Sequence, residues 1–146
     1  MENFDYIKLE FPSRSVNESF ARATVGAFAA RLDPTLEELA DIRTAVSEAV
    51  TNCIVHAYPG AIGSIRLRAR IMNGNTLEIS IRDDGIGIPD VNKAREPMFT
   101  TGGEDRSGMG FTIMESFMDK VKVRSTQGKG TTVVMSRRII RRTSGL

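Results

Sequence analysis

The chain has 146 residues, of which 40% are hydrophobic and 26% are charged. This size and composition fit one globular domain spanning residues 1–146 and leave little room for a second one. The 20 basic and 18 acidic residues give a formal net charge of +2, and such an even balance argues against a nucleic-acid binder.

No segment of the sequence is typical of export or membrane insertion. The N-terminal stretch MENFDYIKLEF carries acidic residues and no long apolar run, so it does not resemble a signal peptide. No stretch approaches the roughly 20 apolar residues of a membrane span. Cys53 is the only cysteine and lies in an apolar run, which predicts a buried, unreactive thiol and no intramolecular disulfide. We therefore expect a cytoplasmic protein in a reducing compartment.

The N-terminal part of the sequence predicts a strand followed by two helices. Residues 6–11 (YIKLEF) alternate apolar and polar side chains, the period of a half-buried strand. Residues 15–32 show helical spacing, with Ser15 and Glu18 in a capping-box pattern. The second helix is predicted over residues 33–58 and has the apolar face Leu39, Ile42, Val46, Ala49, Val50 and Cys53. Its predicted start is Asp33 as N-cap, with Pro34 at the first helical position.

Three polar residues, Glu48, Asn52 and His56, follow one another at four-residue spacing near the end of the second helix. Positions four apart differ by only about 40° around a helix axis, so a carboxylate, an amide and an imidazole form one stripe beside the apolar face. Taken alone, the stripe is explained as well by solvated polar side chains and by a histidine at the negative end of a helix.

The middle of the sequence predicts a β-hairpin. Residues 64–72 and 76–83 both alternate, and Asn73-Gly74 between them is a strong turn sequence. Arg66, Arg68 and Arg70 share one face of the first strand. The simplest interpretation is that this face meets solvent while the other face packs on the helices.

The C-terminal part predicts a third helix and a second hairpin. The helix covers residues 110–120, and the hairpin pairs residues 121–126 with 131–138 around Gln127-Gly128-Lys129-Gly130. The arginines from 137 onward, with the polar ending TSGL, predict a solvated basic tail over about 137–146. The sum is an α+β fold whose largely antiparallel sheet is covered on one face by helices.

Glycine-bearing stretches at 82–90, 100–111 and 128–133 mark places where the backbone can bend sharply or approach a ligand. Gly108-Met109-Gly110, directly before a helix, exposes N–H groups of the kind that bind phosphate. Each stretch alone is weak evidence. The P-loop and the complete G-x-G-x-x-G motif are both missing.

The order of the motifs is more specific than any one of them. They are E-x-x-x-N-x-x-x-H at Glu48, Asn52 and His56, D-x-G-x-G at Asp83, Gly85 and Gly87, G-x-G-F at 108–111, and G-T-T at 130–132. This order resembles the GHKL ATPase/kinase superfamily of gyrase, Hsp90, histidine kinases and MutL. The resemblance covers nearly all of the chain and implies a Bergerat-type ATP-binding fold.

Within that superfamily, the stretches NESFAR, DPTLEELADIRTAVSEAVTN, MFTT and RSGMGFTIMESFMD are similar to the sporulation anti-sigma factors that are serine kinases. The resemblance implies a homodimer that binds ATP or ADP with Mg²⁺. It also implies that a sigma-F-like sigma factor is held inactive and that a small anti-anti-sigma protein is phosphorylated on serine. Neither nucleic acid nor a membrane is an expected partner.

Carried over residue by residue, the resemblance implies that Asn52 is the Mg²⁺ ligand and Glu48 the general base. An amide oxygen is a hard, neutral ligand that suits Mg²⁺, and a carboxylate one helical turn earlier can accept the proton of an attacking hydroxyl. Asp83 is expected to accept from the adenine amino group, and Thr131 to support that contact. The other nucleotide-binding residues implied are His56, Gly85, Gly87, Thr101, Ser107, Gly108, Met109, Gly110 and Phe111.

Residues 97–107 resemble a short ATP lid. Arg106 is the permanent cation expected near the γ-phosphate and is the second catalytic residue implied. The sequence departs from the family pattern at Gly102-Gly103, where relatives tend to have Lys and Pro. The departure concerns lid contacts and leaves the nucleotide core unaffected.

Two alternatives remain open at this stage. A general-stress anti-sigma kinase would carry the same motifs, and a non-catalytic module could bind nucleotide and sequester a partner without phosphorylating it. The ATP domain of a histidine kinase normally follows helices that carry a phosphoacceptor histidine, whereas the only histidine here lies in the nucleotide motif.

Overall fold

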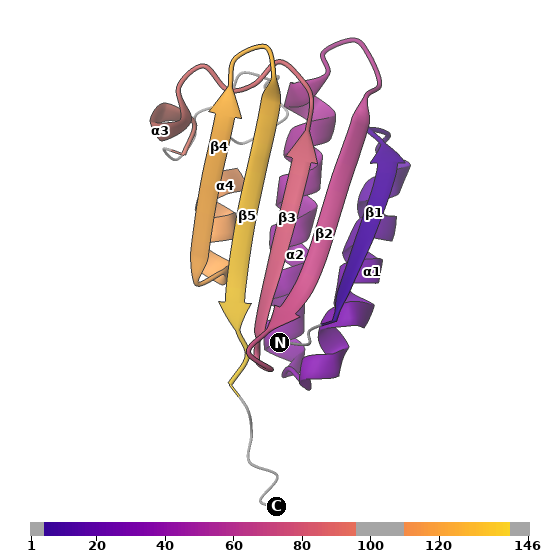
Figure 1. The fold of residues 1–146 in the computed structure, drawn as a ribbon, viewed down its shortest axis with the longest axis vertical. Helices are drawn as coiled ribbons and strands as arrows, with labels where there is room; N and C mark the ends of the chain where they lie inside the picture. Colours follow the sequence, from indigo (N-terminus) through magenta and orange to yellow (C-terminus); the bar gives the residue numbers. More distant parts are fainter. Residues whose placement is uncertain (1–4, 96–109, 141–146) are drawn as a thin grey trace, which may run out of the picture.

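The computed structural model describes residues 5–95 and 110–140, which form one antiparallel sheet with helices packed on one of its faces (Figure 1). The strands, in the spatial order β1-β2-β3-β5-β4, are β1 (Tyr6–Pro12), β2 (Ser64–Met72), β3 (Thr76–Asp83), β5 (Gly130–Arg138) and β4 (Lys120–Thr126). All four ladders are antiparallel. This confirms the predicted α+β fold with its sheet covered on one face.

The helices lie behind the sheet in the view of Figure 1, apart from a short one near the end of β4. They are α1 (Val16–Ala29), the 3-10 turn η1 (Ala30–Leu32), α2 (Leu36–Asn52), the π-helical turn η2 (Cys53–Ala57), α3 (Val91–Ala94) and α4 (Gly110–Phe117). In the part of the chain that the structure describes, no helix is long and apolar enough to cross a membrane.

Both predicted hairpins are confirmed. Asn73 and Gly74 have φ angles of 55° and 74°, the left-handed backbone that tight turns between twisted strands require. Between β4 and β5, Gly128 has φ 82°. The turns therefore set the registers of β2 with β3 and of β4 with β5.

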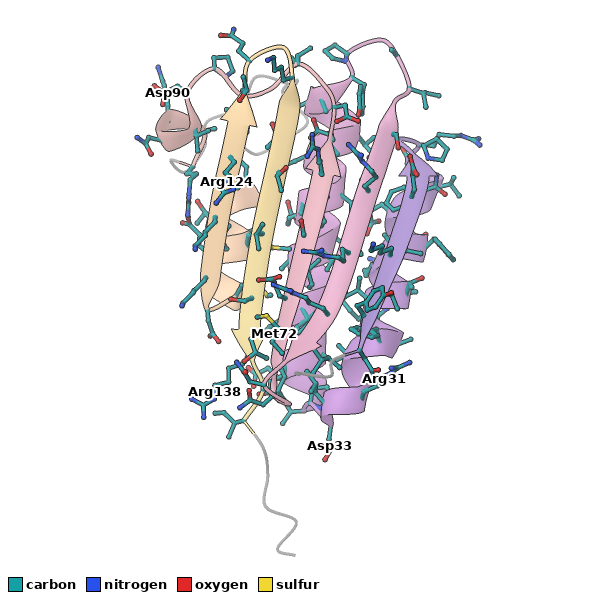
Figure 2. All side chains as sticks on the ribbon, viewed as in Figure 1. Arg31, Asp33, Met72, Asp90, Arg124 and Arg138 are labelled. Carbon is teal, nitrogen blue, oxygen red and sulfur yellow. The ribbon has the colours of Figure 1, made fainter. Side chains whose placement is uncertain are left out.

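The core lies between the sheet and the helices α1, α2 and α4. Along β2, Ile65, Leu67 and Ala69 are buried while Arg66 and Arg68 are exposed, as the alternation predicts. Figure 2 shows the polar side chains that stand on the face opposite the helices, among them Arg124 of β4. Cys53 is buried, as expected.

The first helix begins directly after Ser15, as predicted, but its predicted capping box is absent, and the predicted start of the second helix is wrong. Ser15 has helical backbone angles and makes no capping hydrogen bond with its side chain. The second helix begins after Thr35, whose hydroxyl accepts from the Glu38 N–H at 3.0 Å while the Glu38 carboxylate accepts from the Thr35 N–H at 2.8 Å. Asp33 instead ends η1 in the left-handed region, with φ 54°. Thr35 satisfies one of the free N–H groups at the start of α2, so the cap moves two residues along the chain.

The predicted long helix over 33–58 changes character at its end. Regular α-helix stops at Asn52, and Cys53–Ala57 continue as a π-helical turn. A π-turn closes hydrogen bonds to the fifth residue and not the fourth, so His56 leaves the regular stripe of Glu48 and Asn52. Periodicity alone cannot show such a bulge.

The basic tail begins later than predicted. Arg137 and Arg138 belong to β5, and Ile139 is buried in the core. Arg137 Nη1 donates to Asp41 Oδ2 at 2.9 Å and to the Phe117 carbonyl at 2.8 Å, which ties β5 to α2 and to the end of α4. Residues 141–146 lie outside the described part.

The observed cap can be tested against the predicted one. Thr35→Ala should lower the free energy of unfolding by about 1 kcal/mol, because it leaves the Glu38 N–H without its acceptor. Ser15→Ala is the matched control and should change it by less than about 0.5 kcal/mol, since no cap bond is lost. Urea denaturation of the two variants measures both values. Equal losses would contradict the assignment of the cap to Thr35.

Candidate functional site

A cavity of about 440 Å³ opens where the end of α2 and η2, the segment after β3, the start of β5 and the start of α4 meet. All of these lie at the same end of the sheet, at the top of Figure 1. The size is that of a small-molecule site. Seven of the residues predicted from sequence line it: Asn52, His56, Asp83, Gly87, Gly110, Phe111 and Thr131.

Among the described residues that line the cavity, Asp83 is the one buried carboxylate, with 4% of its surface exposed. It is the last residue of β3 and faces Thr131 of β5 across the antiparallel pair. Its Oδ1 accepts from the Gly85 N–H at 2.9 Å. The burial raises the pKa of the Asp83 carboxyl above its ordinary value, and hydrogen bonds from the Gly85 N–H, the Cys53 thiol and the Thr131 backbone oppose this only in part. Asp83 can therefore both cap the turn after β3 and line the cavity.

Cys53 lines the cavity beside Asp83, a position that sequence analysis did not give it. Burial raises the pKa of the Cys53 thiol well above its ordinary value, and the neighbouring Asp83 charge raises it further. The thiol therefore stays protonated and donates to the carboxylate. In the sequence, the only indication that Cys53 belongs to the cavity was its place next to Asn52. The contact with Asp83 could not be predicted, because it joins residues that are far apart in the chain.

The segment after Asp83 is held on one side by the turn η2 and the residue after it. Tyr58 Oη accepts from the Asp84 N–H and donates to the Ser64 carbonyl, both at 2.7 Å. The Ile86 N–H donates to the Ala57 carbonyl at 2.9 Å. Any Cβ on Gly85 would lie 2.1 Å from that same carbonyl oxygen. Gly85 thus permits packing against η2, and it does not itself line the cavity.

The same segment is held on the other side by the β4–β5 hairpin. The Gly128 N–H donates to the Ile86 carbonyl at 2.6 Å, and the Ile88 N–H donates to Ser125 Oγ at 2.6 Å. Gly87, with φ 80°, approaches so closely that a Cβ would lie 2.5 Å from the Thr126 carbonyl oxygen. This segment is therefore fixed from both sides, which preorganises this wall of the cavity.

Glu48 and Asn52 of α2 lie next to the first residue of α4. A Cβ built on Gly110 would lie 3.1 Å from Asn52 Nδ2, 3.2 Å from Asn52 Oδ1 and 3.4 Å from Glu48 Oε1. Asn52 lines the cavity, whereas Glu48 lies beside it. The first N–H groups of a helix have no partner within it and carry a partial positive charge, so the start of α4 favours an anion.

The polar groups beside α4 suit a magnesium ion that is coordinated mainly by the phosphate oxygens of a bound molecule. Among residues 5–95 and 110–140, no group of three or more His, Cys, Asp or Glu residues could hold a metal by itself. Mg²⁺ keeps several waters and is commonly bound through one or two protein oxygens together with phosphates. The side-chain amide oxygen of Asn52, which lines the cavity, is a metal ligand of this kind.

Several predicted residues lie outside the described part of the chain, namely Thr101, Arg106, Ser107, Gly108 and Met109, together with the whole of the predicted lid at 97–107. Sequence analysis missed much of the cavity wall, which includes Ala49, Ile86, Ile88, Pro89, Asp90, Lys93, Ala94 and Val133. The apolar members suit the faces of a flat ring. Their only mark in the sequence was proximity to the glycine motifs.

Comparison with known proteins gives a consistent result. The sequence model of the histidine kinase-like ATPase domain matches residues 11–137. The chain is 58% identical over 140 residues to the anti-sigma F factor of Caldanaerobacter subterraneus subsp. tengcongensis, covering 95% of this chain and 97% of that protein. It is 55% identical over 135 residues to the anti-sigma F factor of Geobacillus kaustophilus, covering 90% of each.

Solved structures agree on the fold. A Mycobacterium tuberculosis protein with RsbU and RsbW domains superposes with a TM-score of 0.68 at 19% identity, over 92% of this chain and 32% of that one. The catalytic domain of the histidine kinase ThkA gives 0.57 at 16% identity, over 91% of this chain and 96% of that one. At these identities the likeness concerns the fold alone.

The raised pKa of Asp83 predicts a pH-dependent stability. Because ionisation is less favourable in the folded chain, the contribution of Asp83 is greatest below its ordinary pKa of 3.8 and falls as pH rises through the raised folded value. Asp83→Asn removes that loss, so the stability of the variant relative to the wild type should increase as the pH rises above about 4. Urea unfolding at several pH values measures the difference. Parallel curves for the two proteins would contradict the prediction.

Proposed function

Because this chain belongs to the histidine kinase-like ATPase family and, within it, to the anti-sigma F factors, we propose that it binds and inhibits a sigma factor and phosphorylates a serine of an anti-anti-sigma protein with Mg-ATP. The observation that carries the kinase part is the placement of Glu48 and Asn52 together beside the first residue of α4, with Asn52 lining the same cavity as Asp83. We assign Asp83 to the nucleobase and the start of α4 to the phosphates.

The cavity accommodates ATP in one direction. The Asp83 carboxylate accepts from the exocyclic amine of adenine, and guanine would present a carbonyl oxygen there, which the carboxylate repels. Apolar side chains such as Ile88 and Val133 cover the ring. The phosphates then lie toward Gly110 and the N-terminal end of α4. Asn52 would hold Mg²⁺, which neutralises phosphate charge when bound.

Glu48 is proposed as the general base. As the serine oxygen of the partner attacks the γ-phosphorus, its proton passes to the Glu48 carboxylate, a bond forms between that oxygen and phosphorus, and the bond to the bridging oxygen of ADP breaks. The products are ADP and phosphoserine. Arg106 remains a prediction for the cation that faces the γ-phosphate, since it lies outside the described residues.

The surface of α1 supports a partner-binding role. Val16 and Phe20, one turn apart, are 64% and 56% exposed, which is unusual for large apolar side chains on a helix that packs on the core. Arg22, two residues after Phe20 and therefore on the opposite side of the helix, pairs with Glu18 at 3.7 Å. It borders a groove of about 350 Å³ against α2, together with Arg43. We propose that both protein partners contact α1 and that Arg22 takes part in the contact.

The remaining parts of the proposal rest on the family relationship. A homodimer, a role in sporulation and a cytoplasmic location are expected from the anti-sigma F relatives. Those relatives favour this assignment over a general-stress anti-sigma kinase. The choice between a kinase and a non-catalytic sequestering module depends on Glu48.

Glu48→Gln separates these two functions. The variant keeps the side-chain volume and an acceptor oxygen, so folding and ATP binding should persist. Phosphorylation of the partner serine should fall about 10²- to 10⁴-fold, the usual loss when general-base assistance is removed. Labelled ATP and the anti-anti-sigma protein provide the assay, and sigma-factor inhibition should be unchanged.

Glu37→Gln, an exposed site in the first turn of the same helix, is the matched control and should leave the rate unchanged. A nearly normal rate for Glu48→Gln would show that Glu48 is not the base. Loss of ATP binding would make its role structural.

Arg22→Ala tests the partner surface. We expect binding to the sigma factor and to the anti-anti-sigma protein to weaken by about tenfold, as when an interface arginine is truncated, with ATP binding unaffected. Arg68→Ala, an exposed arginine on the opposite face of the sheet, is the control. Surface plasmon resonance measures both. Unchanged affinity for both partners would place the interface elsewhere.

A further inference from the structure

We propose that Ser125, on β4, is a positioning residue that makes the Thr131 hydroxyl a hydrogen-bond acceptor in the base pocket and thereby sets the preference for a 6-amino purine. The proposal rests on the proposed binding of ATP. Neither the sequence motifs nor the lining of the cavity includes Ser125.

Ser125 Oγ joins three segments of the chain. It accepts from the Ile88 N–H at 2.6 Å, donates to the Gly130 carbonyl at 3.1 Å, and lies 2.8 Å from Thr131 Oγ1. Ser125 is half-buried and lies opposite Thr131 in the β4–β5 ladder. One hydroxyl thus connects the segment after Asp83 with both strands of the hairpin.

The number of protons decides the direction of these bonds. The Ile88 N–H can only donate and the Gly130 carbonyl can only accept, while each hydroxyl has one proton. All three contacts of Ser125 are satisfied when it donates to Gly130, so Thr131 must then donate to Ser125. In that arrangement the remaining lone pairs of Thr131 Oγ1 are available to the cavity, and its proton is not.

Thr131 and Asp83 are direct partners in the β3–β5 ladder and line the same cavity. With the Thr131 proton committed to Ser125, the pocket presents two neighbouring acceptors, a carboxylate and a hydroxyl oxygen. An exocyclic amine has two protons and matches this pair, directly or through one water. A 6-oxo group offers only lone pairs, which neither acceptor can satisfy.

Loss of the Ser125 hydroxyl removes this constraint. In Ser125→Ala, the Thr131 hydroxyl can rotate and direct its proton into the cavity, and the Ile88 N–H loses its acceptor. The affinity for ATP should fall about tenfold, since an acceptor for the amine is lost and a donor takes its place. GTP, which gains a donor, should change by less than about twofold.

The experiment measures dissociation constants for ATP and GTP on the full chain by competition with a fluorescent nucleotide. Ser125→Ala should reduce the ATP-to-GTP preference about tenfold, whereas Ser125→Thr retains the hydroxyl and should stay within about threefold of the wild type. Ser80→Ala is the matched control, the same substitution on the opposite face of β3. An equal weakening of ATP and GTP would indicate a merely structural role and overturn the proposal.

A double-mutant cycle with Thr131→Val tests the coupling, and the single Thr131→Val variant keeps the proposal testable even if Ser125→Ala does not fold. Thr131→Val alone should lower the ATP-to-GTP preference, and adding Ser125→Ala should lower it no further. Full additivity, or an unchanged preference in Thr131→Val, would overturn the proposal. If the wild-type chain bound no ATP, the proposed function itself would be wrong. If the wild type bound ATP normally and Ser125→Ala kept the wild-type ATP-to-GTP preference, only the proposal about Ser125 would be wrong.

Discussion

The antiparallel register of β3 with β5 is the constraint on which the rest of the site depends. It sets Asp83, at the end of one strand, directly against Thr131, near the start of the other. Both side chains share the face that packs toward the helices, because successive residues of a strand point to opposite faces. A slip of one residue would turn one of the two toward solvent. The side-by-side placement of Asp83 and Thr131 in the cavity is therefore a product of strand pairing.

Two parts of the cavity wall are built in different ways. The segment after Asp83 consists of backbone that is packed closely on both sides, with Gly85 against η2 and Gly87 against the β4–β5 hairpin. The part around Asn52 depends on two helices, since Glu48 and Asn52 of α2 meet the first residue of α4. In the proposed complex with ATP, the rigid first part would give base selectivity and the second part would hold the phosphates.

Burial of Asp83 shows how function is favoured at the expense of stability. An ionised carboxylate with 4% exposure is costly in the folded chain, and the hydrogen bonds it accepts offset only part of that cost. In the proposed complex, the same burial would strengthen its interaction with a ligand amine, since water competes little there.

The sequence by itself determined the elements and the faces that they bury. The alternation in β2 predicted exposed Arg66 and Arg68, and Asn73-Gly74 predicted the hairpin, because each depends on residues close together in the chain. The placement of Glu48 and Asn52 on one face of a helix was likewise predicted from residues close together in the chain.

Only the tertiary structure decided which distant residues meet. Thr35 and not Asp33 caps α2, and the π-turn moves His56 out of the regular stripe. The contacts of Cys53 with Asp83, of Ser125 with Ile88, and of Arg137 with α2 and α4 join segments far apart in sequence. Local periodicity states which face of an element is buried. It does not state which neighbour covers that face, since register and packing are set by the whole chain at once.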